Sequence, residues 1–252
     1  MEKTFTERLE VLRADLRACN DFNTKMLLWG SFTVDYCHDV AMTKIDRSFY
    51  AFQSEPNEKP DVLVLGLNPK GDYPYASIFN NEKDGWGLNQ LGRMTPEVFI
   101  HQNPWYIGGK FEDVKWNILK NLKKTIEVNE DFHSRFDKMM YMNILYFNSV
   151  DFSEFKSFSK KNWKEVYENC IRLSTLLIFE IIKPTKIICL GINSCFRPFI
   201  GQEHEEELFK NRLYKCVLNG YNVYGMSHPS SRISNSDRQE IGRQLYADWL
   251  KS

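Results

Sequence analysis

Residues 62–69 read Val-Leu-Val-Leu-Gly-Leu-Asn-Pro, an apolar run that ends on an asparagine followed by a proline. A short, uninterrupted apolar run is typical of a strand that is buried on both faces, as in a parallel sheet. Residues 223–230 repeat this plan with Val-Tyr-Gly-Met-Ser-His-Pro-Ser. In open α/β sheets the ligand site lies outside the carboxyl ends of the strands. We therefore expect the two runs to present an amide and an imidazole to one crevice, which would suit a neutral, planar ligand such as a nucleobase.

Four apolar runs have this strand character, and amphipathic segments lie between and around them. The strands are expected at residues 62–67, 139–147, 186–191 and 222–226, and the helices at 5–19, 114–126, 163–182 and 237–250. For the last helix, Ser236 is the expected N-cap and Gln239 would complete a capping box. This alternation predicts an α/β fold, a three-layer α/β/α sandwich around a mainly parallel four-stranded sheet. We expect one domain over residues 1–252, with an N-terminal helical extension (1–60) and a core (61–252).

Net charge, cysteine spacing and the length of the apolar runs limit which partners and which kinds of site we expect. The formal net charge is zero, so a surface for nucleic acid would have to be a local patch. The six cysteines form no C-x-x-C pair, which predicts reduced thiols, a cytoplasmic protein and no zinc or iron–sulfur site. The first residues do not resemble a signal peptide, and no apolar run approaches the roughly 20 residues of a membrane span. We expect no membrane partner, no metal and no other cofactor.

The stretch between the first strand and the helix at residue 114 is about 45 residues long, whereas loops in compact domains are usually shorter than about 15. It is dense in glycine, proline, asparagine and aromatic residues. Long loops of this kind are often functional. We predict that its aromatic residues, taken as a group, form the walls of a base pocket, although each of them alone is better explained by packing within the loop.

Two short motifs carry a resemblance to a known family. Gly66-Leu67-Asn68-Pro69 ends the first expected strand, and His228-Pro229-Ser230 ends the last. In sequence, order and strand-end placement they resemble the two signature motifs of the uracil-DNA glycosylase superfamily, over residues 61–250. The asparagine is closer to the mismatch-specific and single-strand-selective branches than to the classical branch, which has aspartate there. The cysteine ligands of the iron–sulfur branches are absent.

The resemblance implies a monofunctional DNA glycosylase. Such an enzyme flips uracil or a related damaged base out of DNA and hydrolyses its N-glycosidic bond, without a cofactor. By this resemblance Asn68 would orient the attacking water and, because an amide cannot accept the proton, would give a slower enzyme than aspartate. His228, in its neutral form, would donate to O2 of the base. Gly66 and Leu67 would line the substrate pocket.

Base recognition would involve further residues. Asn143 matches the strand asparagine that reads the base edge, since its amide offers both a donor and an acceptor, and Asn148 is the alternative. Phe79 lies near the family's stacking phenylalanine, with Tyr75 or Trp86 as alternatives. Lys70 departs from the family pattern, which has tyrosine or glycine there, and leaves the identity of the base open.

Contacts to DNA would come from the second motif and the residues after it. Ser230, Ser231 and Arg232 would bind phosphates, and either Arg232 or Ile233 would fill the space left by the flipped base. The arginine series 232, 238 and 243 lies beside this motif, whereas the lysine clusters near residues 110–124 and 156–164 are better explained as solvated helix faces.

Two other readings stay open. The chain could be a catalytically weak or inactive protein of the glycosylase fold that binds a nucleobase, a nucleic acid or a protein partner. Residues 1–60, which the resemblance does not cover, would either cover a sheet face or meet that partner. An unrelated α/β hydrolase using Ser230 or Ser231 with His228 is disfavoured, because neighbouring side chains on one strand end do not readily face each other and no G-x-S-x-G elbow exists.

Overall fold

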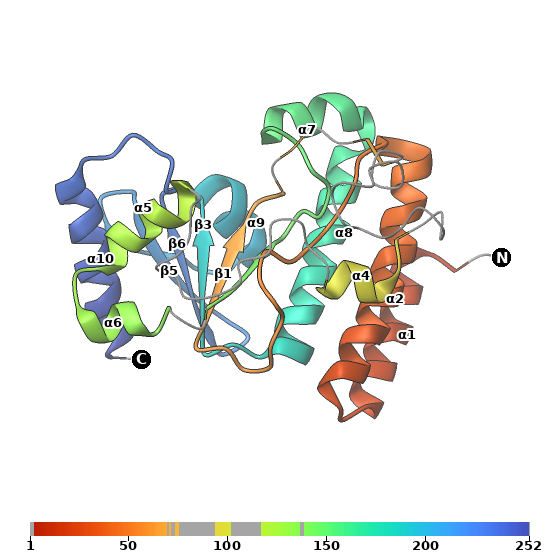
Figure 1. The fold of residues 1–252 in the computed structure, drawn as a ribbon, viewed down its shortest axis with the longest axis horizontal. Coiled ribbons are helices and arrows are strands. Elements are labelled where there is room, and N and C mark those ends of the chain that lie inside the picture. The colour runs from red at the N-terminus through yellow and green to blue at the C-terminus, as the bar shows by residue number, and fades with distance from the viewer. Residues whose placement is uncertain are drawn as a thin grey trace. The chain divides into compact units, whose positions relative to one another are not determined.

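The computed structural model describes residues 3–69, 71, 74–75, 94–101, 117–136 and 139–251. The protein is an α/β protein with a mixed six-stranded sheet (Figure 1). The chain divides into two compact units, each built from separate stretches of sequence. The first unit contains Met1–Glu58, Asn68–Tyr106 and Asn143–Lys183, and the second contains Lys59–Leu67, Ile107–Met142 and Pro184–Ser252.

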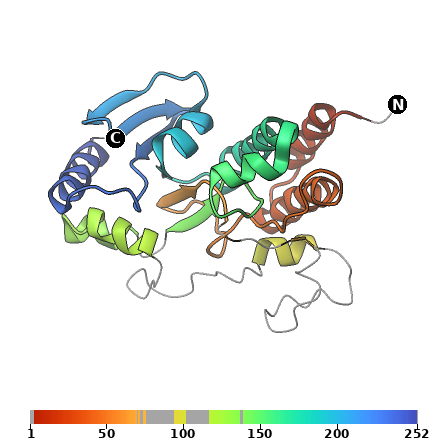
Figure 2. The same ribbon diagram turned by 90° about the horizontal axis from the view of Figure 1, so that it is seen from above.

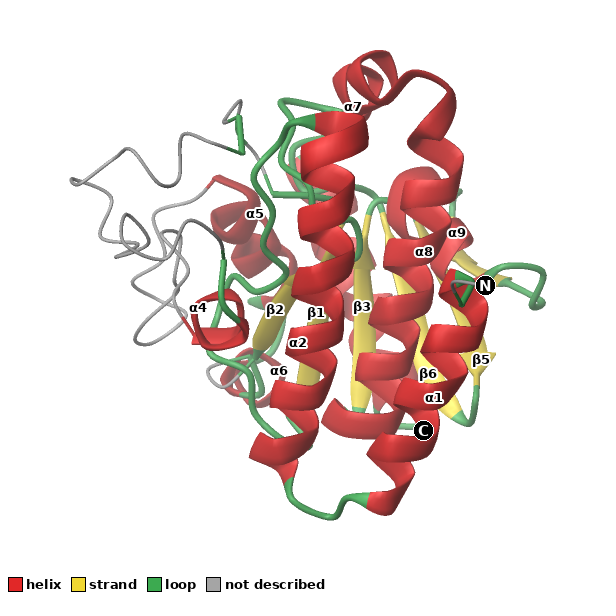
Figure 3. Cartoon of the chain, turned by 90° about the vertical axis from the view of Figure 1, so that its right-hand side faces the viewer, coloured by secondary structure: helices red, strands yellow, loops and turns green. Residues whose placement is uncertain are grey.

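The sheet belongs to the second unit, apart from Asn143 at the end of β2, and Figure 3 shows its strands in yellow. Its order is β2-β1-β3-β6-β5-β4. The strands are β1 Val62–Gly66, β2 Met140–Asn143, β3 Lys186–Leu190, β4 Glu206–Phe209, β5 Leu213–Leu218 and β6 Tyr221–Met226. β1, β3 and β6 run parallel, with Leu65 beside Cys189 and Leu190 beside Met226. The carboxyl ends of these three strands therefore open at one edge of the sheet.

The expected count of four strands was two too low. β5 pairs antiparallel with β6, and β4 pairs antiparallel with β5. The β5–β6 hairpin turns at Asn219 and Gly220, whose φ angles are 53° and 83°. Two consecutive positive φ angles are the requirement of a type I′ turn, which Asn-Gly satisfies well. The sheet is thus mixed, with a parallel part that carries both motif strands and an antiparallel edge.

Helices complete the second unit and bury one core with the sheet. They are α5 Asn117–Ile126, α6 Glu130–Ser134, α9 Arg197–Ile200 and α10 Asn235–Trp249, with a π-helical segment at Ile192–Phe196. The predicted N-cap of α10 was wrong by two residues. Ser234 caps the helix, because its Oγ accepts the N–H of Asp237 at 3.0 Å.

The first unit is mainly helical. It contains α1 Phe5–Ala18, α2 Phe22–Val40, α4 Pro96–His101, α7 Phe152–Ser159 and α8 Trp163–Leu176, with short 3-10 or π-helical segments at Ala41–Ile45, Lys160–Asn162 and Leu177–Ile182. α1 and α2 lie side by side (Figure 2). Trp29 of α2 is fully buried, its Nε1 donates to the Leu173 carbonyl at 3.1 Å, and its ring packs against Phe52 and Phe99. The N-terminal helices therefore share a core with residues from later in the chain.

The strand expected at residues 139–147 is shorter than predicted. β2 ends at Asn143, whose N–H donates to the Ala51 carbonyl at 2.8 Å. Beyond it, Phe147 forms an isolated bridge with Phe49. The apolar residues after Asn143 are buried, as the pattern indicated, but their backbone pairs with the segment before β1. Among the described helices, none is long and apolar enough to cross a membrane.

Candidate functional site

The loop of the second motif follows β6 and is held at several points. The Ser227 N–H donates to the Arg212 carbonyl at 2.8 Å, and the Ser231 N–H donates to the His228 carbonyl at 2.8 Å. Asn121 of α5 donates through Nδ2 to the Pro229 carbonyl at 3.0 Å. These bonds fix the backbone on both sides of the histidine, so its ring is presented from a defined turn.

Gly191 directly follows β3 and lies beside His228. Its φ is +113°, a value that side chains with a Cβ rarely adopt, and its N–H donates to the Met226 carbonyl at 2.9 Å. A Cβ at this position would lie 2.7 Å from Ser194 Oγ and 3.9 Å from His228 Cδ2. Glycine is therefore required here by the backbone conformation and by the Ser194 hydroxyl, while the His228 ring lies at an ordinary van der Waals distance. The sequence placed this glycine in a strand and gave no sign of its role.

The hydrogen bonds of His228 define its tautomer. The Ser230 N–H lies 3.3 Å from Nδ1, and the Ser230 hydroxyl lies 2.6 Å from the same nitrogen. Because a backbone N–H can only donate, Nδ1 is the acceptor, and the proton of the neutral ring is on Nε2. Burial lowers the pKa of His228 below its ordinary value, which favours the neutral ring at pH 7. The site thus offers a neutral Nε2–H donor.

Asn68 of the first motif is oriented by Ser149. Its Nδ2 donates to Ser149 Oγ at 2.8 Å, and the Pro69 and Ser149 carbonyls lie within hydrogen-bond distance of the same nitrogen, at 3.0 and 3.2 Å. The Ser149 N–H in turn donates to the Pro69 carbonyl at 3.1 Å. With Nδ2 bound, Oδ1 of the half-buried Asn68 is left as an acceptor that can hold a water molecule. Ser149 lies 81 residues away in the chain, and nothing in the sequence singled it out.

Asn143 and Asn148, the two candidates for reading a base edge, differ in their surroundings. Asn143 is 1% exposed, and its Nδ2 has no hydrogen-bond partner within the described part of the chain. Asn148 is fully buried and donates through Nδ2 to Ser48 Oγ. A buried amide without a partner is costly and calls for a specific reason, such as a ligand. Asn143 therefore fits the role of a ligand-binding amide better than Asn148.

Tyr75 is part of the core of the first unit. It is 2% exposed, its hydroxyl lies 2.8 Å from His38 Nδ1, and its ring stacks on Phe49 at 5.4 Å between centroids. A stacking role against a base would require the ring to leave this packing. Phe79, Trp86 and Lys70 lie outside the described residues, so their predicted roles stay predictions.

The remaining candidates lie in the second unit. Gly66 is the buried last residue of β1, and Leu67 after it is half-buried. In the loop of the second motif, Ser230, Ser231 and Arg232 are exposed. Ile233 packs against the core of this unit. Arg232 is therefore the freer of the two candidates for a wedge. The structure brings His228 together with Ser230 and Gly191 in the second unit, and Asn68 together with Ser149 in the first.

Comparison with known proteins gives no family: no protein-family model matches the chain, and no curated protein sequence does. The link to the glycosylase superfamily thus depends on the two motifs alone. No group of three or more His, Cys, Asp or Glu side chains that could hold a metal ion occurs in the described ranges. All six cysteines are free thiols, and burial raises the pKa of Cys170 to about 12.

Proposed function

We propose that the protein is a monofunctional DNA glycosylase that hydrolyses the N-glycosidic bond of uracil or a related damaged base. The observation that carries this proposal is the buried Nδ2 of Asn143, which has no partner among the described residues. An amide held in this way can donate to a carbonyl on a base edge, such as O4 of uracil, while its Oδ1 accepts from N3–H. Binding of the base would then supply the missing hydrogen bond.

The two motif residues fit the two charges that develop in this reaction. As the bond between C1′ and the base nitrogen breaks, the electron pair leaves with the base and the sugar becomes cationic. The neutral Nε2–H of His228 can donate to O2 of the departing anion. Oδ1 of Asn68 can accept one hydrogen bond from a water whose oxygen then bonds to C1′, and the water's proton is lost to solvent because the amide cannot take it.

The proposal is tested with labelled oligonucleotides that carry one uracil, as single strands and opposite guanine or adenine. We expect strand breakage after alkali, which cuts at abasic sites, with no metal or cofactor added. Intact uracil, hypoxanthine and hydroxymethyluracil substrates would contradict the proposal. Affinity for these oligonucleotides without cleavage would instead favour a binding protein with the same fold.

Replacing Asn143 by leucine should affect the stability of the fold and the recognition of the base in different ways. The buried Nδ2 has no protein partner to lose among the described residues, so Asn143→Leu should leave the thermal midpoint unchanged or raise it. The same change should lower the rate of uracil release by about 100-fold, because a base carbonyl would then be buried without a donor. Calorimetry and a single-turnover assay measure the two effects. A large fall in the midpoint would mean that the amide is structural.

The pH profile should follow the neutral form of His228. Because burial lowers the pKa of His228 below its ordinary value, the rate should be highest where the ring is neutral and should fall to half of its maximum at a pH below 6.5. The fall should follow the uptake of a single proton, which converts the imidazole into the imidazolium. His228→Gln keeps a neutral donor, so its rate should be lower but level over the same range. A parallel fall in both proteins would assign the titration to another group.

A further inference from the structure

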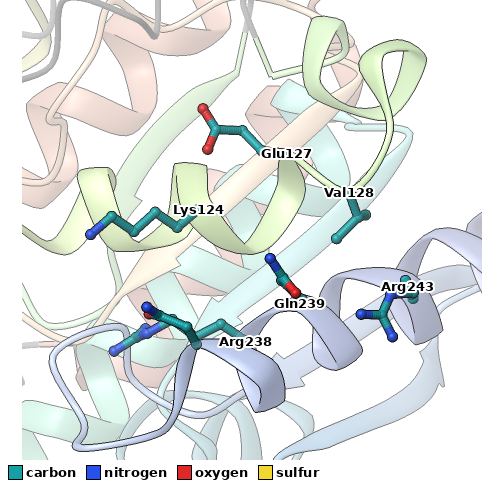
Figure 4. Close-up of a pocket in the computed structure, with 7 residues that line it drawn as sticks. Lys124, Glu127, Val128, Arg238, Gln239 and Arg243 are labelled. Atoms are coloured by element: carbon teal, nitrogen blue, oxygen red, sulfur yellow. The ribbon is translucent and has the colours of Figure 1, made fainter.

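A pocket of about 490 Å³ lies in the second unit, lined by residues of α5 and α10 (Figure 4). Lys124 and Glu127 contribute from α5 and the turn after it, and Arg238, Gln239 and Arg243 contribute from α10. A volume of this size is in the range of small-molecule sites, roughly 300–1,000 Å³. The lining is polar and carries three cations against one carboxylate.

Arg238 is the unusual member of this lining. It is only 8% exposed, and Nη2 donates to the Ser231 carbonyl at 3.1 Å. It forms no ion pair with any carboxylate of the described residues. Burial lowers the pKa of its guanidinium, and no acidic neighbour opposes this shift. A buried cation without a counterion is unfavourable, so an anion in the pocket would relieve a cost that is already present.

The carboxylates close to Arg238 in sequence or space are already paired with other cations. Asp237 lies 3.1 Å from Arg212, and Glu127 lies 3.8 Å from Lys123. Glu240 pairs with Arg243. These pairs neutralise part of the surface but leave Lys124 and Arg238 as uncompensated charges at the pocket.

We propose that this pocket is an anion site that binds a phosphate group. The planar guanidinium of Arg238 can bind two phosphate oxygens at once, Lys124 adds a second uncompensated charge, and Arg243, although paired with Glu240, adds further N–H donors. Asn235 and Gln239 supply amide donors. The pocket also contains the first residue of α10, a helix of 15 residues whose positive end favours anions. The proposal stands apart from the glycosylase chemistry, because it uses none of the groups assigned to that reaction.

Inorganic pyrophosphate, titrated by calorimetry at constant ionic strength, tests the site. We expect saturable binding to the wild-type protein, with affinity lowered about fivefold or more by Lys124→Gln and by Arg243→Gln. Both side chains are exposed, so these changes should not disturb folding. Lys120→Gln is the matched control, because Lys120 is an exposed lysine one turn earlier on α5 that does not line the pocket. Absence of pyrophosphate binding, or an equal loss in Lys120→Gln, would overturn the proposal.

A uracil-free single-stranded oligonucleotide identifies the source of the phosphate. If the pocket holds a phosphate of a DNA strand, Lys124→Gln should weaken binding and reduce the slope of log affinity against log salt by about 1, whereas Lys120→Gln should not. If the oligonucleotide is unaffected while pyrophosphate binding falls, the occupant is a free phosphate compound. Neither measurement involves base release, so an inactive glycosylase and an empty pocket are distinguishable results.

Discussion

Replacement of Asn68 by alanine should lower the rate of uracil release by about 100-fold or more, while the affinity for the oligonucleotide stays nearly unchanged. In the proposed reaction Asn68 acts on the water through Oδ1 and not on the base or the phosphates. Its Nδ2 is held by Ser149 Oγ at 2.8 Å and by the Ser149 carbonyl at 3.2 Å, so the acceptor has one defined direction. Alanine removes that acceptor and leaves the water unoriented.

Two further variants define what the amide does. Ser149→Ala removes one of the partners that orient Asn68 but leaves the Pro69 and Ser149 carbonyls, so we expect a smaller loss, about tenfold. Asn68→Asp replaces the donor with an acceptor, and one carboxylate oxygen would then face the Ser149 carbonyl. Single-turnover rates measured beside equilibrium binding separate the two effects. Full activity in Asn68→Ala would remove this residue from the mechanism, and loss of binding would make it a contact to DNA.

The elements that the sequence predicted well are those whose signals are local. Uninterrupted apolar runs located β1, β3 and β6 to within one residue at each end. The amphipathic pattern over residues 163–182 matches α8 and the π-helical segment after it, which ends at Ile182 before Pro184. In each case the pattern of buried side chains within the segment itself, consecutive in β1 and β3 and on one face in α8, marks the element.

The predictions failed where a strand has no apolar run of its own, or where two neighbouring residues fit the same role equally well. β4 begins with two exposed glutamates, so no apolar run marked this edge strand. The Asn219-Gly220 turn did carry a hairpin signal, which the short apolar pattern around it obscured. Ser234 and Ser236 are equally good caps by type, and in the fold it is Ser234 Oγ that accepts the Asp237 N–H.

Some residues of the candidate site could be predicted from the sequence, and others become visible only in the folded structure. Asn68 and His228 could be found because each ends a strand and stands beside a proline. Their partners could not, since Ser149 reaches Asn68 across 81 residues and Gly191 meets His228 through the register of β3 with β6. Arg238 was one arginine of a series in the sequence. Folding is what sets it apart, because it buries the Arg238 charge without a counterion among the described residues.

Gly242→Ala should destabilise the protein by about 3 kcal/mol or more, against the usual effect of this change. In an ordinary helix alanine is favoured over glycine by about 1 kcal/mol. In α10, however, a Cβ at Gly242 would lie 1.8 Å from the Thr125 carbonyl oxygen of α5. That oxygen belongs to the backbone and cannot rotate away, so the two helices would have to separate and expose the apolar side chains between them.

Gly30→Ala in α2 is the matched control, because it makes the same chemical change within a helix of the first unit. A Cβ there would lie 2.7 Å from Ile100 Cδ1, the far end of a flexible side chain that can adopt another rotamer. We expect its stability to stay within about 1 kcal/mol of the wild type. Urea unfolding followed by circular dichroism compares the two variants. If both changed stability equally, the cost would come from the glycine replacement itself, and the close approach of α5 and α10 at Gly242 would have no part in holding the second unit together.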